Sequence, residues 1–301
     1  MTIFIQIASY RDPELIPTIQ DIIDKAKNPE NLRIGVCRQY HPDDRFDNLD
    51  IYKKDKRFRI VDILFSKSKG CCWARNLTQK LYMGEKYTMQ IDSHMRFLKD
   101  WDIKLIETIL FLQKQGYSKP LLTGYVQGYE PSKVFVAKDN DPPLRMIFDK
   151  FTSEGVTVFK SEIIPYWEQL VCPVPAKFFA GGFSFTLGKF CQEVQYDPEI
   201  YFVGEEISIS VRAFTHGYDL FHPHKTLLWH YYTRKRNIKQ WDDDKTWYLK
   251  DSISYSKLRK LLGIENKGAV NNCGQFGLGT IRSLKDYEKY AGIQFSTSRV
   301  Q

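Results

Sequence analysis

Apolar runs alternate with amphipathic stretches through the first third of the chain. The runs at 3–8, 32–37 and 59–65 are short and are bounded by polar or turn-forming residues, which predicts buried strands. Between the first two runs, apolar residues recur at helical spacing over 15–26, which predicts an amphipathic helix. A polar loop over 38–50 separates the second run from the third.

A helix over 70–83 and a strand over 87–91 complete this pattern. Strands that alternate with helices predict an α/β fold with a mostly parallel central sheet flanked by helices. Ligands of such sheets bind at the carboxyl ends of the strands. Ser9–Arg11, Arg38–Gln39 and Asp92–His94 follow three of the predicted strands, so we expect these polar residues at one edge of the sheet.

The remainder of the chain has a less regular order of elements, without an internal repeat or a low-complexity segment. The elements expected there are a helix over 100–115, a strand over 120–125, an irregular stretch over 126–150, an aromatic and glycine-rich segment over 178–186, a helix over 207–214, short strands over 218–221 and 226–229, and a helix over 251–262. We expect a single domain, because no linker interrupts the pattern.

Asp92 and His94 stand two residues apart where the predicted strand over 87–91 ends. That spacing points both side chains to one face, so a carboxylate oxygen and an imidazole nitrogen can share one divalent ion. Oxygen and nitrogen ligands suit Mn²⁺. The motif is short and is often only structural, so its meaning depends on a third ligand and on the residues around it.

His230 is a candidate for the third ligand. It stands at the end of an apolar run and is followed by Arg234, Lys235 and Arg236, which together with two tyrosines suit a diphosphate. A core histidine followed by a solvated basic turn explains the same residues. The pair in His222-Pro223-His224 can also bind a metal, although a proline between two histidines is more typical of a surface turn.

Three other polar sites have both a functional and a structural explanation. Arg75, on the second predicted helix, can contact a nucleotide or can simply be a polar residue of an amphipathic helix. Glu205 and Glu206 open a helix, where the helix dipole alone favours acids, but a carboxylate pair can also accept a hydrogen bond from a substrate hydroxyl. Gly181 and Gly182 leave room for the close approach of a ligand or of backbone.

Composition narrows the class of protein. Of the 301 residues, 43% are hydrophobic and 15% are aromatic, which marks a folded globular chain with enough aromatic residues for a stacking pocket. The net charge of +8 suits either a soluble basic surface or attraction to a phosphate-bearing ligand. The densest basic stretch, at 53–57, is interrupted by an acid, so we expect no nucleic-acid partner, because such proteins carry a longer basic stripe.

The cysteines and the apolar segments indicate the compartment. Six cysteines show no Cys-x-x-Cys spacing, which favours free thiols in a reducing environment. The apolar N-terminus is too short for a signal peptide and has no basic flank. No stretch approaches the ~18 apolar residues of a membrane helix. We therefore expect a cytoplasmic protein without a membrane span.

Taken together, these residues resemble the GT-A-fold glycosyltransferases. The likeness rests on Asp92-Ser93-His94 with the distant His230, on Ile7-Ala8-Ser9-Tyr10-Arg11-Asp12, and on Phe202-Val203-Gly204-Glu205-Glu206. It is strongest to the GlcNAc-transferase family that includes the cytoplasmic polypeptide hydroxyproline α-GlcNAc-transferase, and residues 279–293 resemble the closing segment of that family. The polypeptide GalNAc-transferases, which share the Asp-Ser-His metal motif, are a more distant likeness.

The resemblance implies a Rossmann-like, nucleotide-sugar-binding GT-A fold. It implies a metal-dependent, retaining transfer of a sugar, expected to be GlcNAc, from a UDP-sugar to a hydroxyl of a polypeptide (hydroxyproline, Ser or Thr) or of a glycan. Mn²⁺ or Mg²⁺ would be the cofactor. The single catalytic domain over 1–301 would contain a nucleotide-binding half over 1–125, an acceptor and metal half over 126–250, and a C-terminal helical cap over 251–301.

The resemblance also implies roles for individual residues. Asp92, His94 and His230 would be the metal ligands, and Glu205 and Glu206 would be catalytic residues that face the sugar and the acceptor. The donor site would comprise Ala8, Ser9, Tyr10, Arg11, Gln39, Arg75, Gln90, Asp92, Ser93, Gly181, Gly182 and Arg234. No residue is an obvious covalent nucleophile, which favours a front-face transfer in which the leaving UDP oxygen helps to take the acceptor proton.

Two other classes of function fit parts of the sequence. A metal-dependent nucleotide-sugar hydrolase would use the same donor site with water as the acceptor, and its product would be free sugar whichever acceptor is offered. A basic nucleic-acid-binding protein would need an exposed stripe of Lys and Arg, and its binding would depend steeply on salt.

Overall fold

The computed structural model describes residues 1–133, 135–138, 140–234, 237–265 and 273–300. Its strands are β1 (Ile3–Tyr10), β2 (Leu32–Tyr40), β3 (Phe58–Leu64), β4 (Tyr87–Asp92), β5 (Met95–Phe97), β6 (Pro120–Thr123), β7 (Gln127–Gly128), β8 (Leu144–Phe151), β9 (Thr157–Ile163), β10 (Val174–Pro175), β11 (Phe183–Leu187), β12 (Asp219–His222), β13 (Leu228–His230), β14 (Ile293–Gln294) and β15 (Arg299–Val300). Its helices are α1 (Leu15–Lys25), α2 (Cys71–Gln79), α3 (Trp101–Lys114), α4 (Phe190–Glu193), α5 (Glu205–Thr215), α6 (Gln240–Asp243), α7 (Trp247–Leu261) and α8 (Leu284–Ala291).

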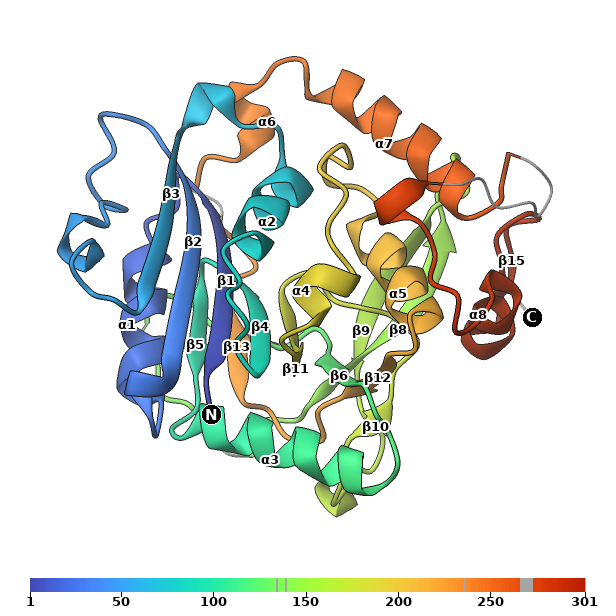
Figure 1. The fold of residues 1–301 in the computed structure, drawn as a ribbon, viewed down its shortest axis with the longest axis horizontal. Helices are drawn as coiled ribbons and strands as arrows, with labels where there is room; N and C mark the ends of the chain where they lie inside the picture. The colour runs from blue at the N-terminus through green and yellow to red at the C-terminus, as the bar shows by residue number, and fades with distance from the viewer. Residues whose placement is uncertain (134, 139, 235–236, 266–272, 301) are drawn as a thin grey trace.

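An eight-stranded sheet forms the centre of the molecule, with the strand order β10-β12-β6-β11-β4-β1-β2-β3 (Figure 1). As the sequence predicts, β1 lies parallel to both β2 and β4, and β2 lies parallel to β3. The register sets Ala8 opposite Asp92 and Tyr10 opposite Gln39. The polar residues that end these strands therefore meet at one edge of the sheet.

Helices cover both faces of the sheet, which confirms the predicted α/β architecture (Figure 1). On one face, Ile5 and Ile7 of β1 share a hydrophobic cluster with Ile19 of α1 and Leu105 of α3. This follows from the alternation of side chains along a strand and from the helical spacing of the apolar residues. A second cluster joins residues of α5, α7 and α8.

The segment over 178–186, which the sequence marks only as aromatic and glycine-rich, contains the strand β11. This strand runs antiparallel between β4 and β6, and its register sets Phe183 opposite Ile91. Antiparallel insertion brings the start of β11, just after Gly181 and Gly182, to the end of β4. The glycine pair consequently lies beside Asp92, whose amide donates a hydrogen bond to the carbonyl oxygen of Gly182 at 3.3 Å.

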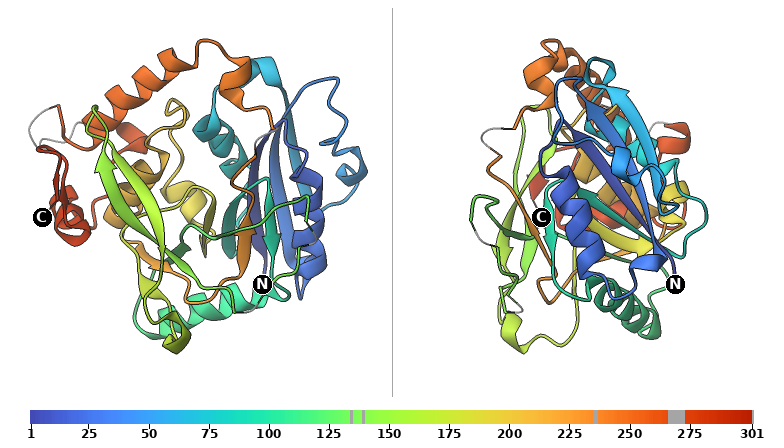
Figure 2. Two further views of the ribbon diagram at one scale, coloured as in Figure 1. Left: turned by 180° about the vertical axis from the view of Figure 1, so that it is seen from behind. Right: turned by 90° about the vertical axis from the view of Figure 1, so that its left-hand side faces the viewer.

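The stretch over 126–150, expected to be irregular, is only partly so. β8 begins inside it and pairs with β9 in a separate two-stranded antiparallel sheet, which faces the viewer in the left view of Figure 2. Two features hide these strands in the sequence. Most of their side chains are at least partly exposed, and the register shifts between Phe148 and Lys150, which breaks the apolar–polar alternation.

Two predicted helices have different ends in the structure. α2 ends at Gln79 rather than near residue 83. α7 begins at Trp247 rather than at residue 251, because its first turn carries exposed apolar residues that give no amphipathic signal. Among the described residues, no helix combines the length and the hydrophobicity needed to cross a bilayer.

A small sheet with the strand order β5-β13-β7 follows the central sheet in the chain, since β5 begins three positions after the end of β4. β13 pairs antiparallel with β5, and the register sets His230 opposite Met95. The amide of Tyr231 also donates a hydrogen bond to the carbonyl oxygen of His94 at 3.1 Å. This pairing delivers His230 to the end of β4, although 138 residues separate it from Asp92 in the sequence.

Candidate active site

A cavity of about 620 Å³ opens where β1, β2 and β4 end. The predicted site residues that line it are Ala8, Tyr10, Gln39, Arg75, Asp92, Ser93, His94, Gly181, Gly182, Glu205, Glu206, His230 and Arg234. The structure thus brings most of the predicted donor site, the three predicted metal ligands and both predicted catalytic acids to one cavity.

Three predicted donor-site residues do not line the cavity. The backbone carbonyl of Ser9 accepts a hydrogen bond from the Gln39 side chain at 3.0 Å, but its own hydroxyl is buried. Arg11 forms ion pairs with Asp44 at 2.7 Å and with Asp243 at 2.9 Å. Gln90 lies behind the wall, where its amide donates to the carbonyl of Gly181 at 2.8 Å. These residues shape the cavity from outside.

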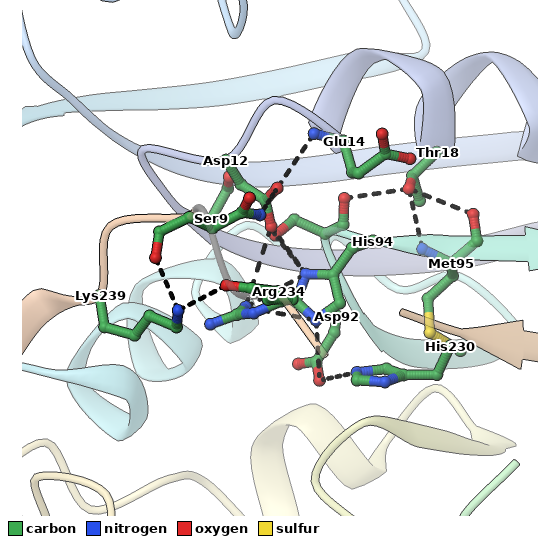
Figure 3. Close-up of polar contacts among 12 residues, drawn as sticks. Ser9, Asp12, Glu14, Thr18, Asp92, His94, Met95, His230, Arg234 and Lys239 are labelled. Carbon is green, nitrogen blue, oxygen red and sulfur yellow. Dashed lines mark hydrogen bonds and ion pairs between the residues drawn. The ribbon is translucent and has the colours of Figure 1, made fainter. Parts of the chain in front are cut away.

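Asp92, His94 and His230 form a cluster of potential metal ligands (Figure 3). His230 Nε2 lies 3.0 Å from Asp92 Oδ2, and His94 Nε2 lies 3.9 Å from the same oxygen. One ligand atom from each residue lies within 4.8 Å of the others. One carboxylate oxygen and two imidazole nitrogens suit Mn²⁺, and this donor set fits the cofactor that the sequence predicts.

His222, the last residue of β12 and one of the two histidines in His222-Pro223-His224, has another role. His222 is buried, and its ring nitrogens lie 2.8 Å from the carbonyl oxygen of Thr123 and 3.2 Å from the amide of Met146. Its hydrogen bonds join β12 to neighbouring backbone. His222 is therefore a satisfied core histidine rather than a metal ligand.

The charges around the cluster favour the protonation states that metal binding requires. Burial alone would raise the pKa of Asp92, but Arg75, His230 and His94 outweigh it and hold the pKa well below its usual value. Burial lowers the pKa of His94, against the opposing effect of Asp12. At neutral pH Asp92 is therefore charged and His94 is neutral, as a metal site needs.

Arg75 of α2 links the metal cluster to the acids of α5. Its Nη2 donates to Asp92 Oδ1 at 2.8 Å, and its Nε lies 2.8 Å from Glu205 Oε1. Tyr196 donates a further hydrogen bond to Glu205 Oε1 at 2.8 Å. Nη1 of Arg75 is buried without a hydrogen-bond partner among the described residues, which leaves a donor for a ligand in the cavity.

Glu206 lies in the same wall with different partners. It accepts hydrogen bonds from the Tyr125 hydroxyl at 2.7 Å and from the Gly181 amide at 3.0 Å. Burial, opposed by these hydrogen bonds, raises the pKa of Glu206 to about 7. The carboxyl group therefore titrates near neutral pH, as a group that exchanges hydrogen bonds with a substrate often does.

Gly181 and Gly182 are required by the closeness of two carboxylates. A Cβ atom at Gly181 would lie 2.8 Å from Glu205 Oε1, and one at Gly182 would lie 3.1 Å from Asp92 Oδ2. The first distance is shorter than real Cβ contacts, and the second would displace the Asp92 carboxylate slightly. A larger residue at either position would displace one of these carboxylates at the end of the cavity that holds Asp92, His94 and His230.

The segment after His230 borders the cavity mouth. Nη1 of Arg234 lies 3.3 Å from each ring nitrogen of His94, and Lys239 Nζ donates to the Arg234 carbonyl at 2.7 Å (Figure 3). Lys235 and Arg236, the other cations predicted for this turn, lie outside the described residues. In α6, Asp243 accepts hydrogen bonds from Tyr10 at 2.7 Å and from Arg11 at 2.9 Å.

The sequence patterns missed three residues of this site. Tyr125 and Tyr196 hold the two acids, and Asp12 lies against His94 Nδ1 at 2.7 Å. Asp12 lies four positions after the predicted strand over 3–8, and Tyr125 is the last residue of the predicted strand over 120–125, so the rule that functional residues gather at strand ends could have indicated both. Tyr196 follows α4 in an irregular segment and carries no comparable signal.

The sheet, the cavity at the strand ends and the cluster of an Asp-x-His motif with a distant histidine define a GT-A glycosyltransferase fold. Two solved structures share this fold. GalNAc-T7, with UDP, GalNAc and Mn²⁺, has a TM-score of 0.61 and 14% identity over 99% of this chain and 55% of its own. An S. aureus TarS fragment in complex with UDP-GlcNAc has a TM-score of 0.53 and 11% identity over 97% of this chain and 71% of its own.

The chain belongs to the GlcNAc glycosyltransferase family. The model of the family described as "Glycosyltransferase (GlcNAc)" matches residues 2–56 and 46–297, which together cover nearly the whole chain. The predicted family is thereby confirmed. No curated protein sequence matches the chain significantly. The chain spans about half the length of the GalNAc-T7 chain that it resembles.

Proposed function

We propose that the protein is a metal-dependent, retaining glycosyltransferase that moves GlcNAc from UDP-GlcNAc to a hydroxyl acceptor. The observation that carries the proposal is the cluster of Asp92, His94 and His230 in the wall of a cavity at the strand ends. Membership in the GlcNAc family supports the sugar. The UDP-GlcNAc complex of TarS and the Mn²⁺ complex of GalNAc-T7 support the donor and the ion.

The donor would lie along the strand ends, with its uridine near Tyr10 and Gln39 of the nucleotide-binding half. Its sugar would lie at the opposite end, beside the glycine pair, Glu205 and Glu206, which line the cavity there. Asp92, His94 and His230 would hold Mn²⁺ or Mg²⁺ between them. The ion, when bound, neutralises charge on the leaving diphosphate.

The chain's own residues favour a front-face transfer with retention. Glu205 is engaged by Arg75 and Tyr196 and is not free to attack the sugar. Burial raises the pKa of the Cys71 thiol to about 12, so this cavity residue stays protonated. The acceptor oxygen would bond to the anomeric carbon as the phosphate oxygen leaves and takes the acceptor proton. Glu206 would accept a hydrogen bond from the acceptor hydroxyl before transfer.

The acceptor would approach through the cavity mouth. Four apolar residues of the cavity lining are also exposed, as residues at the mouth of the cavity would be: Phe202, Tyr232, Ile238 and Trp241. The rings of Phe202 and Trp241 lie 5.5 Å apart. Exposed aromatic side chains beside a pocket commonly recognise a partner. We propose that they hold the part of a polypeptide or glycan that surrounds the reacting hydroxyl.

The experiment that tests this function removes one metal ligand at a time. His94→Ala and His230→Ala should each abolish Mn²⁺-dependent turnover of UDP-GlcNAc while the far-UV circular dichroism spectrum is retained. The matched control is His224→Ala, because His224 lies outside this cavity. Normal turnover in both ligand variants would contradict the assignment.

Product analysis of the same reactions separates a transferase from a hydrolase. UDP and a glycosylated acceptor are expected from a panel of hydroxyproline, serine and threonine peptides and of oligosaccharides. Free GlcNAc as the sole sugar product with every acceptor would show that water is the acceptor and that the protein is a nucleotide-sugar hydrolase.

A further inference from the structure

Asp12 lies behind the metal cluster, outside the cavity wall. It follows β1, precedes α1 and is 2% exposed. Its Oδ2 lies 2.7 Å from His94 Nδ1 and accepts a hydrogen bond from the Ser93 hydroxyl at 2.7 Å. Its Oδ1 accepts hydrogen bonds from the Glu14 amide at 3.0 Å and from the Asn237 side chain at 3.2 Å. Figure 3 shows Asp12 on the far side of the His94 ring from Asp92.

These contacts decide which nitrogen of His94 carries the proton. Three other donors point at the Asp12 carboxyl group, so it is best satisfied as a carboxylate, which can only accept hydrogen bonds. The short contact to Nδ1 then places the imidazole proton on Nδ1. Nε2, which lies on the side of Asp92 and the cavity, keeps its lone pair.

The second imidazole of the cluster has no such support. Nδ1 of His230 is buried without a hydrogen-bond partner among the described residues. The ring is held by the contact of Nε2 with Asp92 Oδ2 at 3.0 Å and by packing, with its centroid 4.6 Å from that of His94 and 4.2 Å from that of Tyr232. Of the two histidines, only His94 has a carboxylate at Nδ1, the nitrogen that does not face Asp92.

We propose that Asp12 is a positioning residue that fixes the tautomer and the ring orientation of His94, so that Nε2 is free to bind the metal. This inference rests on the proposed metal-dependent function and adds a residue to it. A carboxylate behind a metal-binding histidine makes the ligand more basic, and its loss typically costs about 10- to 100-fold in metal affinity.

Asp12 uses a different carboxylate oxygen for each contact: Oδ2 for His94, and Oδ1 for Asn237 in the loop after His230. The effect of Asp12 on His94 can therefore be tested separately from its effect on that loop. Asp12→Asn leaves one acceptor oxygen in place of two. If the amide oxygen of the new asparagine faces His94, its NH₂ group faces two other donors, the Glu14 amide and the Asn237 side chain. In the opposite orientation, the NH₂ group faces Nδ1–H of His94. Asn237→Ala removes only the contact on the other oxygen and is the matched control.

The first measurement is a titration of the full chain with Mn²⁺ alone, followed by electron paramagnetic resonance. Asp12→Asn should raise the Kd for Mn²⁺ about 10- to 100-fold, whereas Asn237→Ala should leave it nearly unchanged. If the unmodified protein binds Mn²⁺ and Asp12→Asn binds it with the same Kd, the proposed role of Asp12 is wrong but the metal site is not. Absence of Mn²⁺ binding to the unmodified protein would overturn the metal site itself, and Asp12 with it.

A double-mutant cycle shows whether Asp12 acts through His94. In a His94→Ala background, where Asp92 and His230 remain, adding Asp12→Asn should cause no further loss of Mn²⁺ affinity. An equal loss in both backgrounds would mean that Asp12 acts through its charge or through the fold, and the proposal would be wrong.

The last measurement needs neither metal nor a variant. The ¹⁵N shifts of the His94 ring in the metal-free protein should show a protonated Nδ1 and an unprotonated Nε2. A proton on Nε2 would overturn the proposal, even if Asp12→Asn does not fold.

Discussion

Glu206 is the residue whose ionisation should be visible in activity. Its pKa is raised to about 7, and the carboxylate form accepts a stronger hydrogen bond from an acceptor hydroxyl than the protonated form does. We expect kcat/KM to rise with pH through about 7. Glu206→Gln should lose this rise and about 10- to 100-fold in rate, because a hydrogen bond to a charged group contributes about 1.5–3 kcal/mol. The measurement is a pH–rate profile of both proteins.

The same group should leave a signature in stability. The native protein keeps the Glu206 proton up to about pH 7, whereas the unfolded chain loses it near the ordinary value of 4.5. The native state therefore binds more protons across this window, and the contribution of Glu206 to stability falls as pH rises through it. Glu206→Gln should lack that slope, and an unchanged slope would assign the titration to another group.

At the residue scale, the sequence indicated the candidate metal ligands but not the residues that hold the two acids. The cluster of Asp92, His94 and His230 could be anticipated because metal ligands belong to a few residue types and because strand ends gather at one edge of a sheet. Tyr196 could not, since a tyrosine in a chain so rich in aromatics carries no sign that it will face a buried carboxylate. Such contacts depend on packing between distant segments.

At the element scale, α6 and the start of α7 place two tryptophans in contrasting positions. Trp241 lines the cavity mouth, whereas Trp247 does not, yet their exposures are 38% and 39%. Trp241→Ala should raise the KM for the acceptor about 30-fold, because a tryptophan at the centre of an interface often contributes about 2 kcal/mol. The KM for UDP-GlcNAc should change much less.

Trp247→Ala is the control for this change, since it removes an equally exposed indole from the neighbouring helix. Its acceptor KM should match that of the unmodified protein. If the two variants behave alike, α6 does not contact the acceptor, and the proposed acceptor surface is wrong.

The elements that the sequence predicted best were those with a clear apolar pattern. α1 is buried on one helical face and β1 is a nearly continuous buried run, and both were found with small errors at their ends. β9 was not, because its side chains are mostly exposed or half-buried and give no alternation. β11 is nearly all buried between β4 and β6, but the sequence marked its segment only as aromatic and glycine-rich.

At the scale of the whole molecule, the cavity is lined by segments from both hydrophobic clusters. A ligand that binds there should therefore stabilise the complete fold. At 100 times its Kd, a ligand that binds only the native state adds about 2.7 kcal/mol, which raises the melting temperature by several degrees. We expect UDP-GlcNAc with Mn²⁺ to produce this shift in a thermal melt.

The contribution of the ion is isolated by omitting it. UDP-GlcNAc without Mn²⁺ should give a smaller shift, and His94→Ala should reduce the shift with Mn²⁺ to that smaller value. Equal shifts with and without Mn²⁺ in the unmodified protein would argue against metal-dependent donor binding.

The pairing of β13 with β5 has a consequence for folding. Side chains alternate along a strand, so a slip of one residue would replace His230 in the site by Trp229 or Tyr231. Because 138 residues separate His230 from Asp92, the correct register depends on closing a long loop and is expected late in folding. Mn²⁺ binding could therefore serve as a kinetic probe that reports when a refolding chain has reached its native register.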